Sequence, residues 1–556
     1  MAREDVPRLA VLAAAWAGLF LFVDPRGQFP LNDDFQYAEC ARRLVAGEGM
    51  HLPQWALSAT AAHALLGAVA TAPWGATNQA LRFWEILIGG AGAALVYALA
   101  RRWRAGADVA FLAALTVAWS PLYATLSASF HIDVTASAFT LAGLLAFLHA
   151  RERRAPRWYA AASALVAVSG LSRQTGFLCV AGGLAALSWE RRLSRREAAA
   201  FVLPAALAAA AFAWWVRCVH GPTWAWESGV YSPKADLDYW LRPAARGVVL
   251  ARFGKTLSMT ALFLAPLSLL RARGTFARKT TRGEAVALAA VAAAGLLLWA
   301  KDRGLPLLLN TLTRAGLGAG TLVDADDKPG GWWRSPLLWN AAALTALLSS
   351  LILTRAAAEE NRGPDAEELR AAALFAFAPY LPALVMPVIY DRYLLIFLPV
   401  AAAGFAAGRR DDARRAAPAF AAAAILGFFT WAGLSDYFAW NRARWEAGTT
   451  AARGKPTASV ENGFDWDGQF SLTRNLNELR RRKPARKIGV WEWQTLNRVV
   501  LGTCFKATPK VPGWKLVGEF PYRTPLLPGR GGVVRLFAAP GSVVEGPAPR
   551  MVEHAR

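Results

Sequence analysis

Long apolar blocks, each close to the length that crosses a lipid bilayer, recur along the first 435 residues of this chain. Crossing the hydrocarbon core takes about 20 apolar residues in a helix, which pairs every backbone polar group internally. A water-soluble chain of this size would divide into several domains, and about a quarter of its residues would be charged. Here only 18% of the 556 residues are charged and 55% are hydrophobic. The sequence therefore predicts a mainly α, polytopic membrane protein.

The apolar blocks predict about thirteen membrane helices. The expected spans are residues 7–23, 82–100, 108–126, 134–150, 158–171, 175–189, 198–216, 247–270, 285–300, 336–353, 371–386, 394–408 and 417–435. A secretory signal peptide is the alternative for the first block. No small-x-small cleavage site follows that block and many spans come after it, which favours a membrane helix.

Basic residues in the connecting loops predict the orientation of the bundle. With the N-terminus inside, the inner loops hold 23 Lys and Arg in 57 positions, whereas the outer loops hold 13 in 111. Cytoplasmic loops carry the excess of Lys and Arg, so the N-terminus is expected in the cytoplasm. Most inner loops are short and the outer loops are long, so function is expected on the extracytoplasmic side.

Two regions of different character are expected. Residues 1–435 would form the membrane bundle, with surface helices in the outer loop 24–81. Residues 436–556 would form a small extracytoplasmic α/β domain. Its expected elements are helices at Asp436–Ala447 and Ser471–Arg482 and strands at Lys487–Trp493 and Val533–Ala538.

The net charge of +23 does not indicate a nucleic-acid partner, because the Arg residues lie in short clusters between apolar blocks. The basic cluster Arg480–Lys487 is expected to be a solvated face, and contact with anionic membrane lipids is the alternative. The four cysteines show no C-x-x-C spacing and no metal-ligand pattern.

Acidic residues avoid the centres of the predicted spans. An ion-coupled transporter usually carries carboxylates at membrane depth, so this distribution directs attention to acids at the outer surface. The first outer loop carries Asn32, Asp33 and Asp34 at the start of an amphipathic helix. A functional role for this acidic pair and plain helix capping both remain open.

The second outer loop is short and contains Ser129-Phe-His-Ile-Asp133. Asp133 is its only carboxylate, at a helix start on the same side of the membrane as Asp33. Helix capping is again the alternative. His131 is interpreted as a hydrogen-bonding surface residue rather than a metal ligand.

Two further outer turns carry cations beside apolar helix ends. Arg173 with Gln174 follows the fifth span, and Arg392 with Tyr393 precedes the twelfth. Such an Arg side chain can simply extend to the interface. A guanidinium group also suits phosphate, because it offers a planar fork of donors and a permanent charge. The weaker candidates near outer helix ends are Arg82, Arg252 and Lys255.

The chain resembles the GT-C glycosyltransferases at these motifs, particularly the branch with protein O-mannosyltransferases and the lipid A aminoarabinose transferase. In that branch the first outer loop reads D-[D/E]-x-x-Y-A-x-x-A, and Asp33-Asp34-Phe-Gln-Tyr37-Ala38-Glu-Cys-Ala41 is similar to it. Phe130-His-Ile-Asp133 approximates an F-M-T-D-like string of relatives. Arg173-Gln174 and Asp391-Arg392-Tyr393-Leu-Leu look like two later motifs. His131 and Ile132 depart from the pattern.

The resemblance implies a membrane glycosyltransferase of the cell envelope, a hexosyl- or pentosyltransferase, that uses a polyprenyl-phosphate sugar. It implies transfer with inversion to a glycan, lipid or protein acceptor. The Ala-, Arg- and Trp-rich composition favours a bacterial plasma membrane over an endoplasmic reticulum. Asp33 would be the general base, with Asp34 and Asp133 as further catalytic acids. The expected substrate-binding residues are Tyr37, Arg82, His131, Arg173, Gln174, Arg392 and Tyr393.

Several alternatives to this interpretation stay open. No cofactor is expected, although a divalent metal at Asp33 and Asp133 is left open. The main rival function is a transporter or flippase of lipid-linked sugars. A membrane scaffold that presents the C-terminal domain and a transferase of a phosphoryl group are two others.

Overall fold

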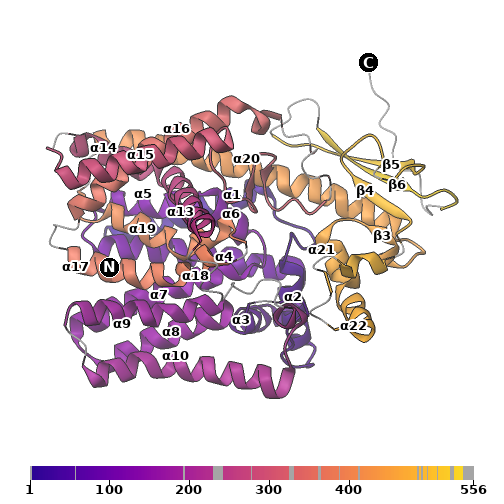
Figure 1. The fold of residues 1–556 in the computed structure, drawn as a ribbon, viewed down its shortest axis with the longest axis horizontal. Coiled ribbons are helices and arrows are strands. Elements are labelled where there is room, and N and C mark those ends of the chain that lie inside the picture. The colour runs from indigo at the N-terminus through magenta and orange to yellow at the C-terminus, as the bar shows by residue number, and fades with distance from the viewer. Residues whose placement is uncertain are drawn as a thin grey trace.

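The structure is a computed structural model of the chain. It describes residues 3–56, 58–191, 194–228, 242–276, 279–322, 324, 328, 331–360, 365–386, 388–410, 413–484, 488–489, 492–497, 499–509, 511–525 and 531–542. Helices form a bundle in which most of them run side by side, and a mixed helix and strand region covers one end of it (Figure 1).

The described helices follow one another along the chain with few strands before residue 460. They are α1 (Asp5–Val23), α2 (Asp34–Val45), α3 (Ala61–Thr71), α4 (Asn78–Arg102), α5 (Ala107–Ala118), α6 (Pro121–Ser127), α7 (Ile132–Arg153), α8 (Pro156–Ser172), α9 (Leu178–Trp189), α10 (Arg195–Trp215), α11 (Trp224–Glu227), α13 (Pro243–Phe263), α14 (Ala265–Phe276), α15 (Arg282–Asp302), α16 (Pro336–Glu360), α17 (Ala366–Phe377), α18 (Leu381–Val385), α19 (Leu398–Ala406), α20 (Ala413–Ala451), α21 (Phe464–Asp467) and α22 (Thr473–Arg482).

Each range expected to span the membrane contains one of these helices or a broken pair of them. In the described part of the chain, 8 helices are long and apolar enough to cross a membrane, or up to 10 when each bent pair counts as one span. The chain is therefore a multi-pass membrane protein with a mainly α fold. The figure of about thirteen spans stays a prediction.

Prolines explain why two expected spans are broken. The range 108–126 consists of α5 and α6, which meet at 64° where Pro121 starts α6. The range 247–270 consists of α13 and α14, which meet at 73° just before Pro266. A proline lacks the donor that would continue a preceding helix and is best tolerated in the first turn of the next one. Each of these two ranges is therefore a broken span or a re-entrant loop.

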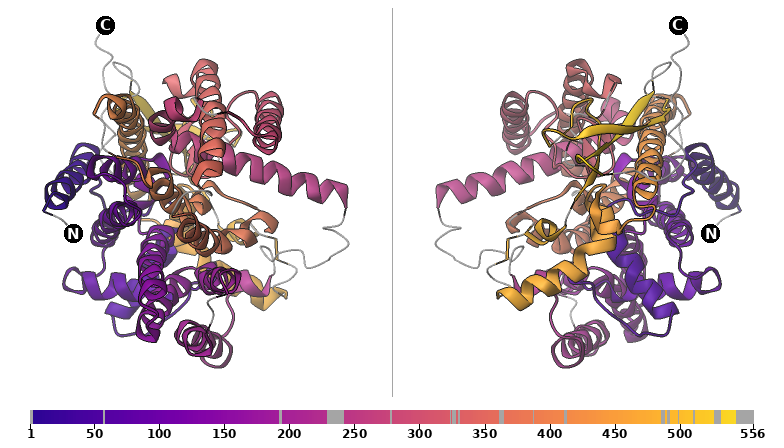
Figure 2. Two further views of the ribbon diagram at one scale, coloured as in Figure 1. Left: turned by 90° about the vertical axis from the view of Figure 1, so that its left-hand side faces the viewer. Right: turned by 90° about the vertical axis from the view of Figure 1, so that its right-hand side faces the viewer.

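Helix α13 lies across the bundle instead of along it. It is viewed almost end-on in Figure 1 and extends sideways from the bundle in both views of Figure 2. Its side chains reach the loops on the same end as the C-terminal region, because Arg252 Nη1 donates to the carbonyls of Leu384 and Met386 at 2.8 and 2.6 Å.

The loops expected on one side of the membrane do meet at one end of the bundle. At the predicted inner end, the amide of Gly106 donates to the carbonyl of Arg409 at 2.7 Å, and Arg102 pairs with Glu368 at 2.7 Å. At the opposite end, Asp391 accepts from the amide of Leu312 at 2.7 Å. The alternation of loops along the chain therefore matches the fold, while the assignment of the inner end to the cytoplasm stays a prediction.

Helix α20 joins the two regions. It is 39 residues long and runs without a break through residue 435, where the domain boundary was expected. The predicted helix Asp436–Ala447 is thus its second half. The division of the chain at 435 stays a prediction, since one helix belongs to both sides of it.

The C-terminal region contains a four-stranded sheet. Strands β3 (Val460–Glu461), β4 (Leu501–Cys504), β5 (Lys515–Tyr522) and β6 (Gly532–Ala538) lie in the order β3-β4-β6-β5, with β3 parallel to β4 and the others antiparallel. Two short strands, β1 (Leu312–Thr313) and β2 (Gly316–Leu317), form a hairpin in the loop after α15. The expected strand at 533–538 and helix at 471–482 are confirmed.

The expected strand at 487–493 is wrong for the residues the structure describes there. Residues 488 and 489 are irregular, and a 3-10 helix spans Glu492–Leu496. Residues 487, 490 and 491 lie outside the described part, as do residues 485–487 of the basic cluster. Apolar character predicted burial here, and Trp493 is indeed fully buried, but in a helical turn.

Candidate functional site

A cavity of about 1460 Å³ opens at the end of the bundle that the C-terminal region covers. Four stretches far apart in the sequence bring polar side chains to its wall: the start of α2, the start of α7, the turn after α8 and the 3-10 helix Asp391–Ile396. The wall includes these residues predicted from sequence: Asp33, Tyr37, His131, Arg173, Gln174, Arg392 and Tyr393.

Asp33 occupies the N-cap position of α2 but does not cap it. Its side chain makes no capping hydrogen bond and instead lies on the cavity wall, where Oδ2 accepts from Arg392 Nη1 at 2.8 Å. The partners are separated by 359 positions in the sequence. Plain capping, the structural alternative for Asp33, therefore does not account for its position.

Asp34 stabilises the loop at this helix start. Its Oδ1 accepts from the amides of Leu31 and Asn32 at 2.7 and 3.1 Å. The side chain is buried, and this burial raises the pKa of Asp34 to about 6. Asp34 does not belong to the described cavity wall, so the structure gives it a role in shaping the loop before α2.

The second outer loop brings His131 and Asp133 next to each other. His131 Nδ1 lies 2.6 Å from Asp133 Oδ2, and Asp133 Oδ1 pairs with Arg173 Nη1. The expectation that His131 is a surface residue is wrong, because its side chain is 2% exposed. Its hydrogen bonding is confirmed, since Nε2 lies 2.8 Å from Arg392 Nη1.

The protonation of His131 follows from these neighbours. A guanidinium group can only donate, so Nε2 must be the acceptor and the ring proton sits on Nδ1, facing Asp133. Burial and the positive charge of Arg392 lower the pKa of His131 to about 3, which keeps the ring neutral near neutral pH. The two carboxylates and two guanidinium groups then sum to zero charge.

Aromatic rings hold the two arginines from the side. The guanidinium carbon of Arg173 lies 4.3 Å from the ring centre of Tyr393, and that of Arg392 lies 4.8 Å from Tyr390. Such cation–π contacts fix a planar group without using its donors. Tyr37 packs edge-on against His131 at 5.4 Å between ring centres. Both arginine side chains remain 11% exposed, toward the cavity.

Arg82 does not join this group. Its guanidinium donates to the backbone carbonyls of Pro25, Gly27 and Phe29, and its side chain is 1% exposed and absent from the described cavity wall. The side chain therefore fastens the loop before α2. Gln174 does lie on the wall, where its Oε1 accepts from the amide of Ala59 at 3.2 Å.

The sequence did not indicate that the loop between α15 and α16 lines the cavity. Asp391 Oδ2 accepts from the amides of Thr311 and Leu312 at 2.9 and 2.7 Å, so the neighbour of Arg392 anchors this loop over the cavity. Burial raises the pKa of Asp391 to about 6. The motif around Arg392 contained Asp391, but nothing in the sequence identified the amides as its partners.

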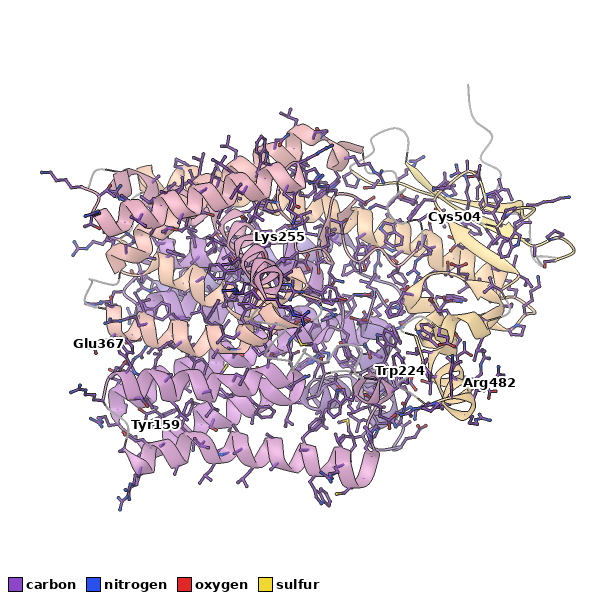
Figure 3. All side chains as sticks on the ribbon, viewed as in Figure 1. Tyr159, Trp224, Lys255, Glu367, Arg482 and Cys504 are labelled. Atoms are coloured by element: carbon purple, nitrogen blue, oxygen red, sulfur yellow. The ribbon has the colours of Figure 1, made fainter. Side chains whose placement is uncertain are left out.

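The loop continues from the cavity to the C-terminal region. The carbonyl of Thr321 accepts from the amide of Phe464 at 2.9 Å, and both residues line the cavity. Lys328 pairs with Asp436 on α20 in a buried contact. Figure 3 labels Lys255 of α13, which lines the cavity, in the middle of the bundle and Trp224 near the C-terminal region.

The described residues contain no group of three or more His, Cys, Asp and Glu side chains that is arranged to hold a metal ion. Asp33 and Asp133 each already have an arginine partner. A divalent ion between them would have to displace these pairs, so the residues present do not fit a resident metal. No chemical step is assigned to one.

Comparison with known proteins gives one family match. Residues 61–216 match the model of the family described as dolichyl-phosphate-mannose-protein mannosyltransferase. This stretch contains the second outer loop and the turn with Arg173. No curated protein sequence matches the chain.

Solved structures give distant similarities over more of the chain. ArnT from Cupriavidus metallidurans bound to undecaprenyl phosphate is 16% identical, with a TM-score of 0.38 and coverage of 98% of this chain and 99% of that chain. The archaeal oligosaccharyltransferase AglB from Archaeoglobus fulgidus, in complex with an inhibitory peptide and a dolichol-phosphate, is 15% identical with a TM-score of 0.42. That match covers 79% of this chain and 58% of AglB. The chain is a multi-pass membrane protein that, on the family match alone, is similar over residues 61–216 to the dolichyl-phosphate-mannose-protein mannosyltransferase family.

Proposed function

We propose that the chain is a membrane glycosyltransferase that moves a sugar from a polyprenyl-phosphate donor to an acceptor hydroxyl on the extracytoplasmic side. One observation carries the proposal: Asp33, Asp133, Arg173 and Arg392, chosen from four separate loops, line or adjoin a single cavity. A carboxylate pair beside two guanidinium groups offers a proton acceptor and anchors for a phosphate in one place.

Asp33 is the better candidate for the general base. Its side chain is 15% exposed and lies on the cavity wall, whereas that of Asp133 is 1% exposed behind Arg173. In the proposed step, the acceptor oxygen attacks the anomeric carbon while the bond from that carbon to the phosphate oxygen breaks. The acceptor proton moves to Asp33, and polyprenyl phosphate leaves with the bonding electrons. A single displacement of this kind inverts the anomeric carbon.

Arg173 and Arg392 would bind the phosphate as the bond breaks. Their guanidinium groups are fixed by carboxylates and tyrosine rings, so little reorganisation is needed when charge develops on the leaving oxygen. An apolar part of the wall suits the polyprenyl chain. It consists of Leu178, Pro379, Pro382, Ala383, Met386, Val388 and Ile396.

Asp133 would act through its neighbours. It contacts both His131 and Arg173, and His131 in turn reaches Arg392. Asp133 thereby sets the tautomer of His131 and the direction of both arginines. Tyr37, Gln174 and Tyr393 would complete the wall around the sugar.

The decisive experiment uses membranes from cells that express the chain, supplied with a panel of polyprenyl-phosphate hexoses and pentoses. Release of polyprenyl phosphate together with labelled product is expected for at least one donor, and Asp33→Asn should abolish it at normal expression. Asp108→Asn, at the opposite end of the bundle beside Arg8, is the matched control and should retain turnover. Full activity of Asp33→Asn would remove Asp33 from the role of base. Movement of the donor across the membrane without sugar transfer would favour the flippase.

We also propose that the cavity faces the outside of a bacterial plasma membrane, with the N-terminus in the cytoplasm. Cys218 provides a test, because it is exposed in the π-helical turn Val216–His220 that continues α10, while Cys40, Cys179 and Cys504 are buried. A membrane-impermeant maleimide should label the chain in intact cells, and Cys218→Ser should lose the label. Labelling that requires permeabilised cells would reverse the orientation.

A further inference from the structure

We propose that Glu85, together with Thr135 and His63, is a buried positioning group that holds His131 and Asp133 in place for the reaction. The inference rests on the proposed function and extends it to residues outside the cavity. All three side chains are 0% exposed, and none belongs to the described cavity wall. They come from α4, α7 and α3, and so connect three helices directly behind the site.

Glu85 is bonded to the first turns of α7. Its Oε1 accepts from the backbone amide of Thr135 at 3.0 Å, and Thr135 Oγ1 lies 3.0 Å from each carboxylate oxygen. Helix starts leave backbone amides without partners inside the helix, and an acceptor oxygen from another element can satisfy them. The N-cap residue of α7 is His131, which makes no capping hydrogen bond with its side chain. Glu85 therefore serves from α4 as the acceptor that this helix start lacks.

His63 completes the network on the other side of Thr135. Its Nδ1 lies 3.0 Å from Thr135 Oγ1. A hydroxyl carries one proton, so when Thr135 donates to Glu85, the Nδ1–H of His63 donates to Thr135. The Nδ1–H of His63 then donates to Thr135, and the hydroxyl of Thr135 donates to Glu85. The His63 ring also stacks on Phe130 with 3.9 Å between centres and meets Tyr37 edge-on at 6.0 Å.

These contacts surround the segment that carries His131 and Asp133. Phe130 precedes His131, and Tyr37 packs against His131 from the cavity side. The next turn of α7 then fixes the segments that carry the two arginines. Ser137 Oγ donates to the carbonyl of Leu395, and Ser169 Oγ donates to the carbonyl of Ala136 at 3.0 Å. A shift of the start of α7 would therefore displace His131, Asp133 and both arginines together.

The experiment compares Thr135→Val with Thr135→Ser in the membrane assay and in binding of undecaprenyl phosphate. Valine keeps the shape and the backbone amide bond but removes the hydroxyl that joins Glu85 to His63. We expect turnover at saturating donor to fall by about 10- to 100-fold, because small displacements of catalytic groups cost rates of this order. Binding of undecaprenyl phosphate should weaken by a smaller factor than turnover falls, since both arginines shift but no phosphate contact is removed. Thr135→Ser restores the hydroxyl and should restore turnover.

Thr116→Val is the matched control, since Thr116 is a buried threonine of α5 whose hydroxyl makes no hydrogen bond within the described part of the chain. It should leave turnover unchanged. Glu85→Gln is a second variant in case Thr135→Val fails to fold: it keeps one acceptor oxygen but places donors against Thr135, and should lower turnover in the same way. Unchanged turnover in both variants, or equal loss in Thr135→Ser and Thr135→Val, would overturn the inference. Full activity of Asp33→Asn in the same assay would instead contradict the proposed function.

Discussion

The contact between Arg392 and Asp33 predicts how charge controls donor binding. Arg392 Nη1 lies 2.8 Å from Asp33 Oδ2, and the cluster with Asp133, Arg173 and neutral His131 has no net charge. The variant Arg392→Gln removes one positive charge and leaves Asp33 unbalanced on the cavity wall. The donor phosphate would then approach an uncompensated carboxylate.

The size of the effect follows from Coulomb's law. Two like unit charges about 4 Å apart repel by about 4 kcal/mol at an effective dielectric constant of about 20. Since about 1.4 kcal/mol corresponds to a tenfold change, Arg392→Gln should weaken binding of undecaprenyl phosphate by about 10³-fold. The double variant Asp33→Asn/Arg392→Gln removes both charges and should bind within about tenfold of the unmodified chain, because only the direct hydrogen bonds are lost. Its turnover should stay lost, because the base is absent.

Isothermal titration calorimetry of the purified protein with undecaprenyl phosphate measures both variants. Arg8→Gln provides a control, because Arg8 forms a comparable pair with Asp108 at 3.0 Å at the opposite end of the bundle. That variant should bind normally. A double variant that binds as weakly as Arg392→Gln alone would refute the charge-balance argument and assign the loss to a direct contact with Arg392.

Three further outcomes are expected. Asp133→Asn should lower turnover by about 10²-fold, measured as kcat, because the neutral amide no longer holds His131 and Arg173 in place. His131 is neutral in the fold down to a pKa of about 3 but titrates near its ordinary value when unfolded, so stability should fall as pH drops below about 6.5. His131→Gln should flatten that decline in melting temperature, and a parallel decline would contradict the assignment. Arg82→Met should lower the melting temperature, because three buried carbonyls lose a partner at about 1–3 kcal/mol each, while the folded variant still binds undecaprenyl phosphate.

The features that depend on the lipid bilayer, namely the membrane helices and the ends at which their loops lie, were predictable from the sequence alone. The length of each apolar block and the basic residues between blocks are local, and the bilayer responds to them directly. The helices, the alternation of loops between two ends and the late strand at 533–538 were therefore foreseen correctly. The breaks beside Pro121 and Pro266 were not foreseen, because both ranges were expected as single spans and the bends depend on packing.

The site was predictable in its residue types and not in its contacts. The motifs selected Asp33, Asp133, Arg173 and Arg392, and one cavity does contain or adjoin them. The same reasoning included Arg82 as a weaker candidate, because it lies near an outer helix end and carries the same charge. Only the fold reveals that Arg82 is enclosed by backbone carbonyls, whereas Arg392 faces a carboxylate.

The sequence by itself thus determined that the chain crosses a membrane and carries acids and arginines at one end of its bundle. The tertiary structure decided which charges are partners, which of two adjacent aspartates faces the cavity, and that Glu85 supports the start of α7. The physical reason is the distance over which each effect acts. Hydrophobic length and loop charge act through the membrane at each position separately, but the state of an ionisable side chain depends on groups within a few ångströms, which packing brings from hundreds of residues away.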